Sequence, residues 1–211
     1  MRRGLLAAAL GVVILIGTGT LACRSRPPGD AGSAAASALA SPSSAPPAAS
    51  VPVADGGLPA PDADVPPVRL TIPAIRVAAR VDPVAVDPAT NDFAVPPSVD
   101  VVGWYRYGPG LSAPAGSVVI AGHVDGAAQG PGAFFRLRDL AIGAEIEVTG
   151  ADGRVVRYTV AAREIYRKTA IPLDRYFARD GAPRLTLITC GGPFDRATGH
   201  YRDNVVITAA R

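Results

Sequence analysis

Aromatic residues are missing from the first 92 positions of this 211-residue sequence, because all twelve lie at or beyond Phe93. Large rings dominate the burial of apolar surface, so their absence excludes a hydrophobic core in that part of the chain. Histidine and cysteine are also scarce, with two of each. No acidic residue or further histidine is grouped with Cys190 at metal-ligand spacing, so the sequence predicts no metal site and no cofactor.

Runs of like charge are absent as well. The net charge is +3, and the charged residues are scattered along the chain rather than gathered into a basic patch. Binding to nucleic acid would require such a patch, so the sequence predicts no nucleic-acid partner.

The N-terminus carries the longest apolar run. Two arginines precede 19 uncharged residues, Gly4 to Ala22, which as a helix would span roughly 28 Å, close to the thickness of a bilayer. We assign residues 1–23 to a transmembrane anchor or signal segment, with the rest of the chain outside the cytoplasm. The alternatives are a lipoprotein modified at Cys23, because the residues before it resemble a lipobox with its leucine misplaced by one, and a secreted protein.

The next segment, residues 24–66, has the composition of a linker. Of its 43 residues, 32 are Ala, Pro, Ser or Gly. Such a segment buries too little apolar surface to offset the entropy of ordering, so we predict a disordered tether. It would reach roughly 40 Å as a coil and up to about 130 Å as an extended chain. We expect the domain that follows to fold and act without residues 1–66.

Residues 67–211 make up the predicted folded domain, and their pattern is that of an all-β protein. Gly150-Ala-Asp-Gly153, between two β-prone runs, is a strong hairpin signal. The one convincing helical piece is short, around residues 133–140. Chains of this size with many short strands form barrels or sandwiches. The expected strands are 69–72, 74–81, 83–86, 117–121, 145–148, 154–162, 184–189 and 204–209.

Cys190 is the candidate nucleophile. The strand Leu185-Thr-Leu-Ile-Thr leads into it, and Gly191 and Gly192 are expected to end the strand and leave space beside the sulfur. It is the only cysteine of the folded region, so it has no disulfide partner there. A lone thiol in an exported domain is a candidate nucleophile.

A thiol nucleophile needs a proton carrier and a stabiliser for the oxyanion. His123 follows the apolar run Val118 to Ala121 and so sits at a strand end, whereas His200 lies in a loop, and we favour His123. An arginine cannot act as the base but can hold the developing oxyanion. Arg196 and Arg202 both follow the cysteine closely, and Arg202 adjoins the strand 204–209, which would fix it better.

Three motifs resemble those of sortases. Thr186-Leu-Ile-Thr-Cys190 resembles the TLxTC signature, Ala121-Gly-His123 the strand end that carries the sortase histidine, and Tyr201-Arg202-Asp-Asn-Val205 the segment that carries the arginine. The order and the gaps of 67 and 12 residues also agree. Cys190-Gly-Gly-Pro-Phe-Asp, Thr198 to Val205 and Val102-Gly-Trp-Tyr105 further resemble the class F sortases of actinobacteria.

The resemblance implies an eight-stranded β-barrel with short helices and a membrane-tethered cysteine transpeptidase with Cys190, His123 and Arg202 in its site. Its partners would be surface proteins with a C-terminal sorting signal like Leu-Pro-x-Thr-Gly, which is cut between Thr and Gly. The acyl group would pass from a Cys190 thioester to an amine of the cell wall or of a pilin. Nothing in the sequence supports the calcium site of some class A sortases.

Two alternatives remain open at this point. A cysteine L,D-transpeptidase is also exported and depends on the same residue types, but it would have arginine two residues after the cysteine, where this chain has Gly192. The domain could instead be a non-catalytic envelope adaptor with an incidental thiol. Reaction with a thiol reagent and cleavage of a sorting peptide would separate these readings.

Overall fold

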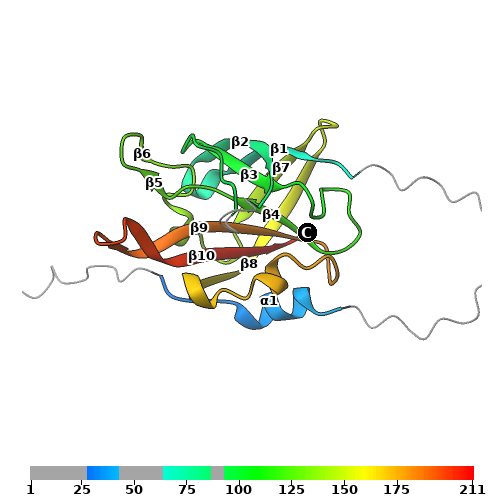
Figure 1. Ribbon diagram of the computed structural model, residues 1–211. Coiled ribbons are helices and arrows are strands. Elements are labelled where there is room, and N and C mark those ends of the chain that lie inside the picture. Colours follow the sequence, from blue (N-terminus) through cyan, green and yellow to red (C-terminus); the bar gives the residue numbers. More distant parts are fainter. Residues whose placement is uncertain (1–27, 43–63, 87–92) are drawn as a thin grey trace, which may run out of the picture.

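The computed structural model describes residues 28–42, 64–86 and 93–211. Eight strands close into a barrel in the order β1-β2-β3-β4-β9-β10-β8-β7 (Figure 1), which confirms the predicted all-β barrel with short helices. The barrel strands are β1 Pro67–Ile72, β2 Val77–Val84, β3 Val101–Tyr105, β4 Ser117–Ala121, β7 Glu145–Gly150, β8 Val155–Arg167, β9 Arg184–Asp195 and β10 His200–Ala210.

Short elements complete the described part of the chain. Strands β5 and β6 pair as a separate small sheet after β4, and short helices lie before β1 and between the barrel strands. Their bounds are β5 Asp125–Gly126, β6 Gly130–Pro131, α1 Ser33–Ala40, α2 Leu173–Tyr176, and three 3₁₀ turns at Pro73–Ile75, Leu137–Asp139 and Lys168–Ala170.

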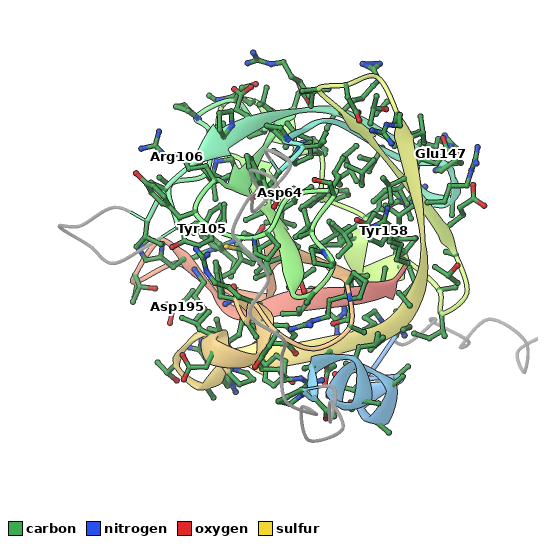
Figure 2. All side chains as sticks on the ribbon, turned by 90° about the vertical axis from the view of Figure 1, so that its right-hand side faces the viewer. Asp64, Tyr105, Arg106, Glu147, Tyr158 and Asp195 are labelled. Atoms are coloured by element: carbon green, nitrogen blue, oxygen red, sulfur yellow. The ribbon has the colours of Figure 1, made fainter. Side chains whose placement is uncertain are left out.

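The alternation of β9 decides which side chains face the barrel interior. Leu185 and Leu187 are fully buried in the core cluster, and side chains fill the space inside the barrel (Figure 2). Because successive residues of a strand point to opposite faces, Cys190 lies on the outer face, as the sequence pattern predicts. The inner face of β9 therefore contributes to the core, and the outer face carries Cys190.

Local predictions are confirmed in part. The hairpin expected at Gly150–Gly153 joins β7 to β8. The helix expected at 133–140 is wrong, because only Leu137–Asp139 forms a 3₁₀ turn. The Phe134 N–H donates to the His123 carbonyl (3.1 Å), so the start of this segment is tied to another loop instead of to its own preceding turn.

The prediction that the strand stops at Cys190 is also wrong, because β9 continues to Asp195. Gly191 pairs with Asp203 of β10. A Cβ on Gly191 would lie 2.8 Å from a methyl of Val205. Gly192 has φ +73°, and a Cβ there would collide with the Asp203 carboxylate. The two glycines therefore serve close backbone approach within a continuing ladder.

Part of the segment with linker composition is ordered against the barrel. Residues 33–40 form helix α1, which lies along β8 and β10 (Figure 1). Alanine has the highest helix propensity, so SAAASALA favours a helix although it counts toward a low-complexity composition. Gly32 precedes the helix with φ +78°, and any Cβ there would collide with the Ala161 carbonyl. The disorder predicted for residues 24–66 thus does not hold for this stretch.

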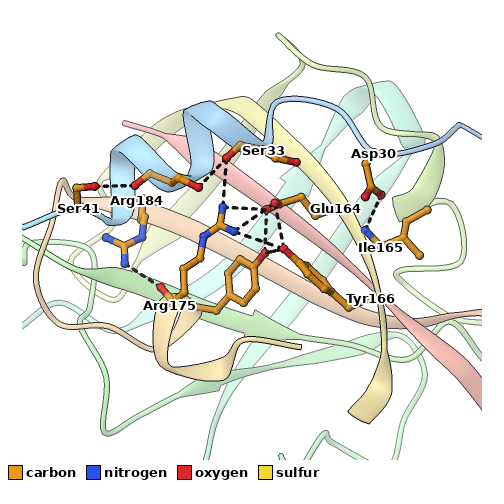
Figure 3. A network of polar contacts seen from close by, with 10 residues as sticks. Asp30, Ser33, Ser41, Glu164, Ile165, Tyr166, Arg175 and Arg184 are labelled. Carbon is orange, nitrogen blue, oxygen red and sulfur yellow. Dashed lines mark hydrogen bonds and ion pairs between the residues drawn. The ribbon is translucent and has the colours of Figure 1, made fainter. Parts of the chain in front are cut away.

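Hydrogen bonds fix this docked segment at both ends, and Figure 3 shows the one between Asp30 and Ile165. Ala31 and Arg163 of β8 exchange two backbone hydrogen bonds of 2.8 Å each. The Asp30 carboxylate accepts a bond from the backbone of β8 at 2.8 Å. At the other end, the Leu39 carbonyl accepts bonds from the Ala182 N–H (2.9 Å) and the Arg184 guanidinium (3.2 Å). The segment thus supplies hydrogen-bond partners to the backbone of β8, to the Ala182 N–H and to the Arg184 guanidinium.

A buried ionic network lies under α1 (Figure 3). Glu164 of β8 is only 2% exposed. It accepts hydrogen bonds from Arg175 (3.2 Å) and from the hydroxyls of Tyr176 (2.8 Å) and Tyr166 (3.0 Å). Arg175 also donates to the Ser33 carbonyl of α1 at 3.5 Å. The network thus connects β8, α2 and α1.

We predict that deleting residues 1–66 destabilises the domain, whereas deleting only residues 1–27 does not. Losing several hydrogen bonds at about 1 kcal/mol each and exposing buried Arg163 and Arg184 should cost roughly 2–4 kcal/mol. For a domain of this size, that loss lowers Tm by roughly 5–15 °C. Thermal unfolding of the two truncations checks this expectation. Equal Tm values would show that α1 contributes nothing, as the linker interpretation holds.

The structure does not test the predicted membrane segment. Gly4–Ala22, Cys23 and the arginines before them lie outside the described residues. Within the described ranges, no helix is both long enough and apolar enough to cross a bilayer.

Candidate active site

Cys190 and His123 are brought side by side by the parallel pairing of β9 with β4. The register of the two strands, carried two residues past Ala121, sets His123 beside Cys190. The Thr189 hydroxyl donates to the Gly122 carbonyl at 2.8 Å, so the residues just before the cysteine and the histidine are bonded to each other. Adjacent strands lie about 4.8 Å apart. β4 and β9 are thus neighbouring strands, and His123 follows the end of β4 by two residues.

The thiol of Cys190 is free and half-buried. Its strand lies between β4 and β10, and its cross-strand partner on β10 is Asn204. In the part of the chain that the structure describes, no hydrogen bond joins this thiol to His123 or Arg202. Cys190 is thus held by a paired backbone while its sulfur remains available for reaction.

The ring of His123 is oriented by a backbone carbonyl. Its Nε2 lies 3.0 Å from the Pro96 oxygen, and because a carbonyl can only accept, Nε2 carries the hydrogen. The other nitrogen, Nδ1, is then the one that can take a proton in the neutral ring. Gly122, directly before the histidine, packs closely against the core, since a Cβ there would lie 2.8 Å from the Phe134 ring. One fixed tautomer suits a proton carrier.

Arg202 lies on β10, on the opposite side of Cys190 from His123. The β9–β10 register shifts between Tyr201 and Asp203, where Gly192 and Pro193 of β9 both face Arg202, so Arg202 lies opposite a β-bulge. Bulges near active sites redirect a side chain. Arg202 donates to the Asp195 carboxylate at 3.1 Å and its side chain is 53% exposed.

The pair between Arg202 and Asp195 lies at the periphery of the molecule, where Figure 2 labels Asp195. The backbone N–H of Ala197 is the main cause that lowers the pKa of the Asp195 carboxyl, and Arg202 adds to the effect. An ion pair this exposed contributes little in water. Arg202 can therefore exchange this carboxylate for a substrate oxygen at small cost.

The two alternative residues lie further from the thiol. His200 is exposed and pairs with Asp195 near the end of the β9–β10 hairpin. It is four residues from Asn204, the partner of Cys190, which is roughly 13 Å along a strand. Arg196 is exposed in the turn that joins the two strands. Neither is held next to Cys190 by strand pairing.

A second polar contact joins β10 to the segment that follows His123. The Tyr201 hydroxyl donates to the Asp125 carboxylate at 2.5 Å, and the Tyr201 ring packs edge-on against Phe194 with centroids 5.1 Å apart. The bond to Asp125 is the main cause that raises the pKa of Tyr201 to about 12. Sequence reasoning missed Asp125 as a site residue, although its position two residues after His123 was a usable signal.

An apolar cluster lies on the outer face of β3, the neighbour of β4. Tyr105 contacts Phe177 with ring centroids 5.2 Å apart, and Phe93 lies 6.1 Å from each. The three rings come from separate stretches of sequence, so no local pattern could have indicated that they meet. Since Gly103 pairs with Ala121 and Trp104 with Ile120, Tyr105 is level with Val119, four residues before His123.

A family model described as Sortase domain matches residues 70–211, a range that contains Cys190, His123 and Arg202. A search of curated proteins gives no match.

Solved structures similar to this chain are also sortases. Sortase C-1 from Actinomyces oris aligns with a TM-score of 0.50 and 22% identity over 67% of this chain and 70% of that one. Sortase A from Corynebacterium diphtheriae aligns with 0.50 and 22%, over 71% and 62%. Sortase C1 from Streptococcus agalactiae aligns with 0.51 and 16%, over 68% and 65%. At these identities, the similarity shows a shared fold, and this chain spans less than two thirds of the last two.

Proposed function

This chain belongs to the sortase family, and we propose that it is a class F-like cysteine transpeptidase that works outside the cytoplasm. The observation that carries the proposal is the Thr189–Gly122 hydrogen bond, which joins the residues directly before Cys190 and His123. The family match and the placement of Arg202 on the next strand support the same site. We propose Cys190, His123 and Arg202 as its catalytic residues.

Acylation would begin at the thiol. His123 Nδ1 takes the proton of Cys190, and the sulfur attacks the carbonyl carbon of the Thr–Gly bond in a sorting signal like Leu-Pro-x-Thr-Gly. The carbonyl oxygen becomes an oxyanion, for which Arg202 supplies charged N–H donors. The C–N bond then breaks as the imidazolium returns its proton to the departing glycine amine, which leaves a thioester on Cys190.

Transfer would reverse these roles. An amine of the cell wall or of a pilin attacks the thioester and loses a proton to His123. The thiolate leaves and takes a proton back, so the free thiol and the neutral ring are restored and a new amide joins the surface protein to its acceptor. We further propose that residues 1–23 anchor the enzyme in the membrane, so that both partners are met in the cell envelope.

The structure disfavours the L,D-transpeptidase alternative at one residue. That reaction would place an arginine at position 192, but Gly192 has φ +73° and any Cβ there would collide with the Asp203 carboxylate. A residue with a long side chain cannot occupy this position without shifting β10. No feature of the described residues favours an adaptor over an enzyme.

The decisive experiment profiles the full chain against a library of fluorogenic Leu-Pro-x-Thr-Gly peptides, with and without added amines. We expect cleavage between Thr and Gly, formation of an amide product when amine is present, and a thioester on Cys190 detectable by mass spectrometry. The Cys190→Ala variant serves as the blank. A chain that reacts with a thiol reagent but cleaves no library peptide would reject the proposal and favour the adaptor.

A further inference from the structure

The hydrogen bond between Tyr201 and Asp125 links the two sides of the site, and its role rests on the function proposed above. Asp125 lies two residues after His123, and Tyr201 directly precedes Arg202, so 76 residues separate the partners in sequence. The strand that carries Cys190 lies between β4 and β10. The contact therefore spans the nucleophile's strand and connects the segment of the proton carrier to the segment of the arginine.

On the histidine side, the backbone near Asp125 is firmly held. Asp125 begins β5, which pairs with β6, and the Gly132 N–H donates to the Val124 carbonyl at 2.9 Å. The Phe134 N–H donates to the His123 carbonyl at 3.1 Å. A bond to Asp125 thus acts on a short, rigid segment that ends at the histidine.

On the arginine side, the backbone is held less firmly at one residue. The β9–β10 register is regular on both sides of Arg202 and shifts at it, because Gly192 and Pro193 of β9 both face this one residue. Arg202 therefore lies opposite a β-bulge. On one side, Asp203 is paired with Gly191. On the other, Tyr201 is paired with Phe194 and bonded to Asp125. Without the bond to Asp125, only strand pairing near the hairpin end would hold this side of the bulge.

We propose that Tyr201 and Asp125 are positioning residues that set the placement of Arg202 and His123 relative to Cys190. Tyr201 does not exchange protons itself, because the bond to Asp125 raises its pKa to about 12 and keeps the hydroxyl protonated. It therefore remains a donor at neutral pH. Reacting groups held about 1 Å from their best position lose up to about a hundredfold in rate.

The test compares single and double variants of the full chain in single-turnover acylation. We expect Tyr201→Phe and Asp125→Ala each to lower the acylation rate at saturating peptide roughly tenfold, with little change in KM. Asp125→Asn keeps an acceptor oxygen and should recover most of the rate. The double variant Tyr201→Phe/Asp125→Ala should be no slower than either single one, because both remove the same bond. Tyr107→Phe, on an exposed tyrosine, is the matched control.

A second measurement does not depend on activity. Hydrogen exchange in Tyr201→Phe should be faster in residues 123–134 and 194–203 and unchanged elsewhere, with Tm close to that of the unaltered chain. If the unaltered chain cleaves no peptide, the proposed function fails and hydrogen exchange alone decides this inference. Unchanged exchange would overturn it. So would a rate within twofold of normal in Tyr201→Phe, or multiplying losses in the double variant.

Discussion

Replacing His123 with alanine should lower kcat/KM for a sorting peptide by about a hundred- to ten-thousandfold. A positioned proton carrier contributes a factor of this size, and His123 both takes the thiol proton and protonates the leaving amine. Its Nε2 is occupied by the Pro96 carbonyl, so Nδ1 is the only ring nitrogen left for both transfers. The loss should therefore appear in the rate of acylation, measured in a single turnover, and not in peptide binding.

His200→Ala is the matched control for this prediction. Its side chain is exposed, roughly four residues of strand from the level of Cys190, so most of the activity should remain. Equal losses in the two variants, or a larger loss in His200→Ala, would show that the proton carrier has been assigned to the wrong histidine.

Arg202→Ala should slow acylation by about a hundred- to a thousandfold, the usual effect of removing one oxyanion donor. The guanidinium presents several N–H groups in a plane, so it can follow the carbonyl oxygen as negative charge develops on it. Arg202→Lys keeps the charge but loses the planar fork and should remain badly impaired. Because the ion pair with Asp195 is exposed, breaking it to reach the substrate should not limit the rate.

Two comparisons isolate the effect of Arg202. The thiol of Cys190 should still react with a small thiol reagent in Arg202→Ala, since the cysteine and its strand are untouched. Arg196→Ala removes an arginine from the same hairpin, six residues nearer the cysteine in sequence, and should stay close to normal. Near-normal acylation in Arg202→Ala, or a comparable loss in Arg196→Ala, would remove Arg202 from the catalytic set.

The parts of the site that follow from local sequence could be predicted. A strand with alternating apolar residues puts Cys190 on the face away from Leu185 and Leu187, and this is where it lies. An apolar run that ends before Gly122 puts His123 at a strand end, and β4 ends there. The alternation of apolar residues and the position where a strand ends depend on a few consecutive residues, so both can be predicted without knowing the partner strands.

The parts that depend on distant residues could not be predicted. The Pro96 carbonyl that fixes the His123 ring and the Asp125 carboxylate that holds Tyr201 reach the site through the barrel topology. β3 was missed because Gly103 interrupts its pattern, yet a Cβ there would lie 2.8 Å from Val84. These features depend on tertiary contacts, which local sequence preferences do not reveal.

The docked segment before α1 changes how far the enzyme can act from a bilayer. If Cys23 marks the end of a membrane anchor, four residues remain before residue 28, and the chain from Cys23 to residue 28 spans at most about 18 Å. Ala31 adjoins β8, which is two strands from β9, so its place on the barrel is about 14 Å from the strand of Cys190. The distance between the membrane and the site at Cys190 is then limited by the point where the chain first binds the barrel. An enzyme anchored in this way would act only in a shallow layer above the membrane. Both its substrate and its acceptor would have to enter that layer.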